Sequence, residues 1–208
     1  MTYKILKKES FFITEGIQSI INKEFRVKKG EYDEIEIRYV IDYILKYIIT
    51  ENKILKDKET FELGSWLLQF VFNGFFIDIY ELKNVLGGKN IYKEGIDIAT
   101  KIYRIQSSLI NEGISPLIPK FSQKIALTKD IYDGSEVNGV RYSAPSHMTG
   151  WYLTSNSYKG DVNTLIVEYL YFIIDKRFDI IKFLSLPIGY RFYRDNQEES
   201  FWLDEQIK

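Results

Sequence analysis

The first half of the chain repeats its apolar residues every three or four positions. Four such sets occur, and each would form one stripe along an amphipathic helix. The sets are Ile13, Ile17, Ile20 and Ile21; Ile37, Val40, Ile41, Ile44 and Ile48; Leu63, Trp66, Leu67, Phe70 and Val71; and Ile98, Ile102, Ile105 and Leu109. Thr60 is a suitable N-cap for the third helix, Asn73 and Gly74 would end it, and residues 75–82 are short enough for a strand. The spacing predicts a mainly helical region over residues 1–118.

Short strands and turns replace the helical pattern beyond Pro119. Residues 124–128 alternate apolar and polar side chains, and Asn138 followed by Gly139 is a typical hairpin turn. Further strands are predicted at residues 140–142, 151–154, 188–193 and 200–203. These strands would form an antiparallel sheet.

One helical stretch interrupts the predicted sheet at residues 163–184, where Asp179 is placed to cap a second short helix. The expected fold class is therefore α+β, with a mainly helical N-terminal half packed with a C-terminal antiparallel sheet that carries one or two helices. We divide the chain into a helical region, residues 1–118, and an α+β domain, residues 119–208. Because no flexible linker separates them, we expect one compact body.

Composition excludes several kinds of chemistry. The 208 residues include no cysteine and one histidine, so disulfides, thiolate nucleophiles and cysteine-bound zinc are excluded, and no metal or other cofactor is predicted. No apolar run reaches the roughly 18 residues of a membrane span, and the start lacks the features of a secretory signal. We therefore expect a cytoplasmic protein without membrane insertion. The 28 basic and 29 acidic residues do not indicate nucleic acid as a partner.

Acidic residues concentrate at the C-terminal end of the chain. They are Asp195, Glu198, Glu199, Asp204 and Glu205, with no basic residue among them. One interpretation is a surface that attracts a basic protein partner, and the other is a solvated hairpin tip and tail.

The stretch RYSAPSHMTGW, residues 141–151, places a cation, a proline and the only histidine between two predicted strands. A pocket for a small molecule would be framed by Arg141, Tyr142, His147, Trp151, Tyr190 and Arg191. No catalytic residue is predicted, because the serines near His147 lack a GxSxG elbow and an orienting third group. The alternative for His147 is structural, with its imidazole bonded to a backbone carbonyl so that the loop is fixed.

The arginines and tryptophans of this half have two interpretations each. Arg141 and Arg191 could form internal pairs, with Asp161 or Asp204, or bind an anion at a surface. Trp151 and Trp202 are expected in the core, and Met148 is either a gap filler or an exposed contact residue.

An ordered series of motifs in residues 121–208 resembles the thirty-third family of immunity proteins from bacterial polymorphic-toxin systems. The motifs are QKIA at 123–126, GVRY at 139–142, PSHMTGW at 145–151, YKGD at 158–161, Arg177, LPIGYRF at 186–192 and WLD at 202–204. The resemblance implies a cytosolic protein that is encoded beside a toxin, binds it and blocks it. The family commonly has histidines near the positions of Tyr169 and Phe172, so no acid–base or metal role is carried over to that segment.

The leading hypothesis is an immunity protein that binds a protein toxin and occludes its active site or substrate groove. The acidic residues and Met148 would contact the partner, which is expected to be basic. The alternative is a module that binds a metabolite around Arg141, His147 and Trp151. The pattern does not predict an oligomeric state.

Overall fold

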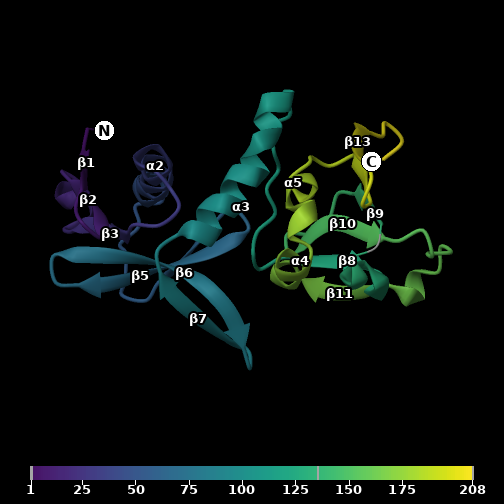
Figure 1. The fold of residues 1–208 in the computed structure, drawn as a ribbon, viewed down its shortest axis with the longest axis horizontal. Coiled ribbons are helices and arrows are strands. Elements are labelled where there is room, and N and C mark those ends of the chain that lie inside the picture. Colours follow the sequence, from purple (N-terminus) through teal and green to yellow (C-terminus); the bar gives the residue numbers. More distant parts are fainter. Residues whose placement is uncertain (1, 135, 208) are drawn as a thin grey trace. The chain divides into compact units, whose positions relative to one another are not determined.

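The computed structural model describes residues 2–134 and 136–207. The chain divides into two compact units, with the division between Lys101 and Ile102. Each unit is built around its own sheet (Figure 1).

The N-terminal unit contains a seven-stranded sheet in the order β1-β2-β3-β6-β5-β4, with β7 paired to β6. Its strands are β1 (Lys4–Lys7), β2 (Phe11–Glu15), β3 (Glu24–Lys28), β4 (Thr60–Leu63), β5 (Trp66–Asn73), β6 (Phe76–Leu86) and β7 (Lys89–Glu94). Only β3 and β6 pair in parallel among the described strands of this sheet. The β6–β7 hairpin extends beyond the other strands (Figure 1).

Helices α1 (Gln18–Ile21) and α2 (Glu34–Thr50) belong to this unit, and α3 (Asp97–Ser107) spans the division between the two units. A capping box starts α2, because Asp33 accepts the Glu36 N–H and the Glu36 side chain accepts the Asp33 N–H. The buried stripe of α2 consists of Ile37, Val40, Ile41, Ile44, Leu45 and Ile48. The helices predicted from the second and fourth apolar sets are confirmed.

The prediction of a mainly helical N-terminal half is wrong. The third apolar set forms β4 and β5, and Thr60 begins a strand rather than a helix. Much of β5 is buried on both faces, so its apolar residues are nearly continuous and mimic the spacing of a helix. Gly64 and Gly74 have positive φ angles in the turns that join β4 to β5 and β5 to β6. The first set is split between β2 and the single turn α1.

The C-terminal unit contains a six-stranded sheet in the order β11-β8-β10-β9-β12-β13. Its strands are β8 (Lys124–Leu127), β9 (Val137–Arg141), β10 (Met148–Thr154), β11 (Ile166–Tyr169), β12 (Tyr190–Arg194) and β13 (Glu199–Leu203). Its helices are α4 (Leu170–Lys176) and α5 (Ile181–Leu184), with 3₁₀ turns η1 (Ser108–Glu112), η2 (Lys129–Asp133), η3 (Val162–Thr164) and η4 (Phe178–Ile180). The helices α4 and α5 gather at one side of the sheet (Figure 1).

The C-terminal unit differs from the prediction in the direction of its strands and in the start of its helix. The sheet is mixed rather than antiparallel, because β8 and β10 run in parallel. The predicted helix at residues 163–184 begins only at Leu170, because Ile166–Tyr169 pair with β8 as an edge strand. The strands predicted around residues 124–128, 151–154 and 200–203 are confirmed. No helix in the described part of the chain is long and apolar enough to cross a membrane.

Candidate partner-binding surface

One face of the C-terminal sheet packs against α5. Trp151 is fully buried, and its Nε1 donates a hydrogen bond to the Leu184 carbonyl at 2.8 Å. The ring of Phe192 stacks on Phe183 with 5.0 Å between centroids, and Trp151 meets Phe192 edge to face. This face is the core of the unit, and we call it the helix side.

Arg141 also lies on the helix side, where it is 3% exposed. Its Nε donates to the Thr149 carbonyl at 3.1 Å, and its Nη1 donates to the carbonyls of Leu117 at 2.6 Å and Leu186 at 2.5 Å. The same Nη1 also donates to a fourth carbonyl, that of Leu184, at 3.3 Å. Burial lowers the pKa of Arg141 to about 10, so the guanidinium remains charged at neutral pH. Arg141 therefore joins three segments through backbone carbonyls.

A second buried arginine, Arg177, stands at the end of α4. Its Nε and Nη2 donate to the two oxygens of Asp179 at 3.0 and 2.9 Å, and its Nη1 donates to the Ile131 carbonyl at 2.7 Å. Asp179 also accepts a hydrogen bond from Arg194 Nε at 2.9 Å. Burial alone would raise the pKa of Asp179, but the two arginines outweigh it and the net effect is a lowered pKa.

We expect Asp179→Asn to reduce the free energy of unfolding by about 1–2 kcal/mol at pH 7, since Arg177 stays buried with weakened pairing. A lowered folded-state pKa means that this stabilisation is complete above the ordinary value of 3.8 and is lost as pH falls below it. Urea denaturation followed by tryptophan fluorescence should therefore separate the two proteins at pH 7 and show them converging toward pH 3. Asp175→Asn, in an exposed pair with Lys176, is the control and should change little. An equal difference at both pH values would contradict the assignment.

The opposite face of the C-terminal sheet carries a row of residues paired directly across all six strands. The row is Val167, Ala126, Tyr152, Val140, Arg191 and Trp202, in strand order. Directly paired residues share one face, and burial alternates accordingly: Tyr152 is 40% exposed and Trp202 is 45% exposed, while neighbouring Trp151 and Leu153 are fully buried. We call this surface the open face.

Further aromatic side chains extend the open face beyond the central row. Tyr142 meets Tyr152 edge to face at 5.5 Å, and Lys124 Nζ lies 5.1 Å from the centre of the Tyr169 ring. Tyr193 follows Arg191 by two positions on β12 and therefore belongs to the same face. The open face thus combines tyrosine, tryptophan and arginine, the residues enriched at the centres of protein interfaces.

The predicted acidic residues fall into two groups, one at the β12–β13 turn and one after the end of β13. Arg194 pairs with Glu199, and Arg191 Nε pairs with Asp204 Oδ2 at 2.6 Å. Asp195 Oδ1 accepts the N–H groups of Gln197 and Glu198 in the β12–β13 turn, and Asp195 Oδ2 accepts the Tyr193 hydroxyl. Glu198 is exposed, as is Glu205 beyond β13. That these carboxylates contact a partner stays a prediction.

Three carboxylates form one flank of the open face. Continuing the strand register two residues past Asn138 and Tyr193 places Glu136, Asp195 and Glu198 in one row. None of the three forms an ion pair within the described residues. We call this row the acidic flank. Glu136 was not singled out by sequence reasoning, because only the sheet register brings it to the C-terminal hairpin.

The loop at residues 143–148 is held by Gln123. The amide Nε2 of Gln123 donates to the carbonyls of Ser146 at 2.9 Å and Met148 at 3.0 Å, while its Oε1 accepts the Lys120 N–H. The side chain of His147 is exposed and forms no hydrogen bond with a described residue, so the prediction that it fixes the loop is wrong. Met148 is half-buried beside the open face.

The residues of the predicted pocket do not converge on one side of the sheet. Arg141, Trp151 and Tyr190 belong to the helix side, whereas Tyr142 and Arg191 belong to the open face. The expected internal pairing is found for Arg191 with Asp204, but Arg141 binds carbonyls instead of Asp161. Trp151 is in the core as predicted, and the same prediction for Trp202 is wrong because its ring is half exposed.

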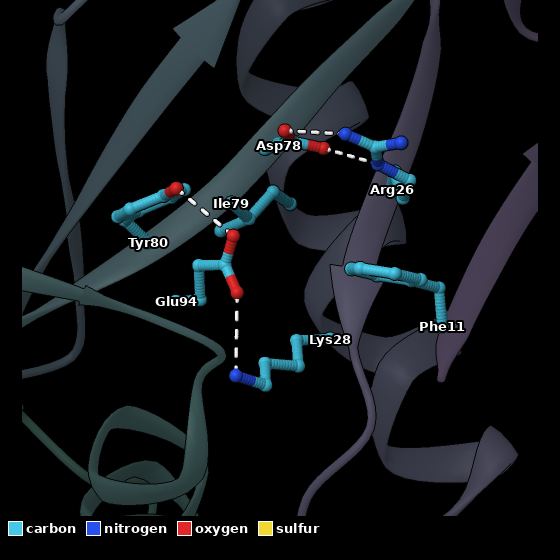
Figure 2. A pocket seen from close by; sticks show the side chains of 7 residues that line it. All are labelled: Phe11, Arg26, Lys28, Asp78, Ile79, Tyr80 and Glu94. Carbon is cyan, nitrogen blue, oxygen red and sulfur yellow. Dashed lines mark hydrogen bonds and ion pairs between the residues drawn. The ribbon is translucent and has the colours of Figure 1, made fainter. Parts of the chain in front are cut away.

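The N-terminal unit has a shallow depression lined by Phe11, Arg26, Lys28, Asp78, Ile79, Tyr80 and Glu94 (Figure 2). Arg26 Nε and Nη2 donate to the two carboxylate oxygens of Asp78 at 2.6 and 2.8 Å. Glu94 pairs with Lys28 at 3.3 Å and accepts the Tyr80 hydroxyl at 3.1 Å. Because each of these charges already has an opposite partner, the depression offers no unmatched charge to a ligand. Among residues 2–134 and 136–207, no group of three or more histidine or carboxylate side chains is placed to hold a metal ion.

The C-terminal unit is similar to a known protein-family model. Residues 106–204 match the model of the Imm33-like domain. The match lies within the C-terminal unit, and we call the matched residues the Imm33-like domain. The resemblance inferred from the sequence motifs is thereby confirmed, and both the helix side and the open face lie within the matched residues. No curated protein and no solved structure matches the chain.

Several residues of the open face of the Imm33-like domain were missed by sequence reasoning. Tyr152, Val167 and Tyr169 were assigned only to strands or a helix, without a role. The available signal was the order Val167-Glu168-Tyr169, which in a strand would place Val167 and Tyr169 on the same face. Strand order decides whether such positions from six segments form one surface, and sequence spacing alone does not specify that order.

Proposed function

We propose that this chain is an immunity protein that binds a protein toxin and neutralises it by covering its active site or substrate groove. The observation that carries the proposal is the match of residues 106–204 to the Imm33-like domain. Under this proposal the chain acts in the cytoplasm, needs no cofactor and has no catalytic activity of its own.

The geometry of the Imm33-like domain supports a binding role. Trp202 and Tyr152 are held exposed on a rigid sheet, which limits the conformational entropy lost when a partner binds. The side chains of Arg141 and Trp151 are occupied by internal contacts, so they support the fold and are not directed toward a ligand. Glu198, Asp195 and their acidic neighbours would steer a basic toxin during encounter.

The experiment that tests the proposal is co-expression with the toxin domain encoded beside this gene. We expect the chain to restore growth and to form a complex that survives gel filtration at micromolar concentration. A chain lacking residues 102–208 gives the matched negative control for the role of the Imm33-like domain. If the full chain fails to rescue growth and no complex forms, the proposal is wrong.

A further inference from the structure

The open face differs from an ordinary water-facing sheet surface. A sheet covered by helices on one side usually carries polar side chains on the other. Here the central row is instead Val167, Ala126, Tyr152, Val140, Arg191 and Trp202. Val167 is 55% exposed, and the rings of Tyr142, Tyr169 and Trp202 are each about as exposed as that of Tyr152. Ala126, between Val167 and Tyr152, is small and only 4% exposed, so the exposed apolar area comes from the larger side chains around it. An exposed group of apolar and aromatic side chains of this kind is typical of an interaction site.

The charges on and around the open face are distributed unevenly. Within the central row the only charged side chain is Arg191, and Asp204 neutralises it. The acidic flank of Glu136, Asp195 and Glu198 borders one end of the strands, and Lys124 lies toward the other end beside Tyr169. A complementary partner would therefore have an apolar centre with basic side chains on the side that meets the acidic flank.

We propose that the open face is the surface that docks the toxin, and that the matching toxin surface is an apolar patch bordered on one side by basic residues. This inference rests on the proposed function, because the Imm33-like match indicates a toxin as the occupant. Tyr152 and Trp202, the aromatic residues of the central row, set the lifetime of the complex, since buried aromatic side chains dominate interface energies. The acidic flank sets the rate of encounter, since peripheral charges act mainly through steering.

The test measures binding of the full chain to the toxin domain encoded beside its gene, inactivated by mutation so that it can be purified. Surface plasmon resonance gives association and dissociation rates separately. The double variant Tyr152→Ala/Trp202→Ala should weaken affinity at least a hundredfold, mainly through faster dissociation. The control is Tyr39→Ala on α2, which removes a tyrosine that is 67% exposed in the N-terminal unit and should change affinity less than threefold.

A second pair of variants tests the flank. Glu136→Lys/Glu198→Lys should slow association at least tenfold at low ionic strength, and the difference should shrink toward 0.15 M salt, where the Debye length is about 8 Å. Glu51→Lys, at the exposed end of α2, is the matched charge reversal and should leave association nearly unchanged. Circular dichroism and thermal unfolding establish that each variant is folded before its rates are compared.

The outcomes separate this inference from the proposed function. A wild-type chain that binds the toxin, with open-face variants that bind equally well, overturns the assigned surface and leaves the proposed function intact. A wild-type chain that binds no toxin overturns the proposed function and the assigned occupant together. A wild-type chain that forms a dimer by itself, lost in Tyr152→Ala/Trp202→Ala while toxin binding persists, assigns the open face to a second copy and overturns the inference.

Discussion

Replacing Arg141 with methionine should lower the free energy of unfolding of the C-terminal unit by about 3–5 kcal/mol. Methionine fills a similar volume but donates no hydrogen bond, so the carbonyls of Thr149, Leu184 and Leu186 lose a buried donor. Leu117, in the segment before β8, also loses its contact. Urea denaturation monitored by tryptophan fluorescence measures the loss, because Trp151 lies next to the guanidinium.

The matched control is Arg191→Met, which removes an arginine of the same sheet from a partly exposed ion pair with Asp204. Such pairs contribute little to stability, so this variant should remain close to the wild type. If the free energy of unfolding fell equally in the two variants, the hydrogen bonds from Arg141 to the carbonyls would stabilise the unit no more than the Arg191–Asp204 pair does. Arg141→Lys should stay well below the wild type, because one ammonium group cannot reproduce the separated donors of the guanidinium fork.

Replacing Gly150 with alanine should cost about 2–5 kcal/mol through two separate effects. The φ angle of Gly150 is +81°, where an L residue is strained by about 1–2 kcal/mol. An added Cβ would also lie 2.1 Å from the Tyr142 carbonyl oxygen, so β9 and β10 would have to move apart at a further cost of about 1–3 kcal/mol. Thermal unfolding of the variant measures the sum.

Gly160→Ala isolates the first of these effects. Gly160 has a φ of +87°, but a Cβ there would meet nothing within 4 Å. We expect this control to lose only the backbone strain of about 1–2 kcal/mol. If Gly150→Ala were no more destabilising than Gly160→Ala, the close approach of β9 and β10 would not be important for the stability of the unit.

The sequence motifs identify the C-terminal unit, but they do not predict which of its residues form the open face. The motifs between Gln123 and Asp204 identified the Imm33-like unit, because each motif is a short combination of residues that can be recognised without the tertiary structure. The prediction for Trp202 failed because a tryptophan in a strand has the same local sequence signal whether its face is covered or open. The role of Gln123 was also missed, because its partners lie more than twenty residues away in the chain.

Local sequence alone determined the elements with strong local signals. The stripe and capping box of α2, the short apolar run of β8 and the C-terminal hairpin depend on residues within a few positions of each other. Tertiary structure decided that residues 60–73 form strands where the spacing predicted a helix, because pairing with neighbouring strands outweighs a helical spacing of apolar residues. It also decided the open face, since Val167, Tyr152 and Trp202 become one surface only when six separate segments pair in a specific order. Hydrogen bonds between distant strands fix that order, and no local pattern in the chain encodes it.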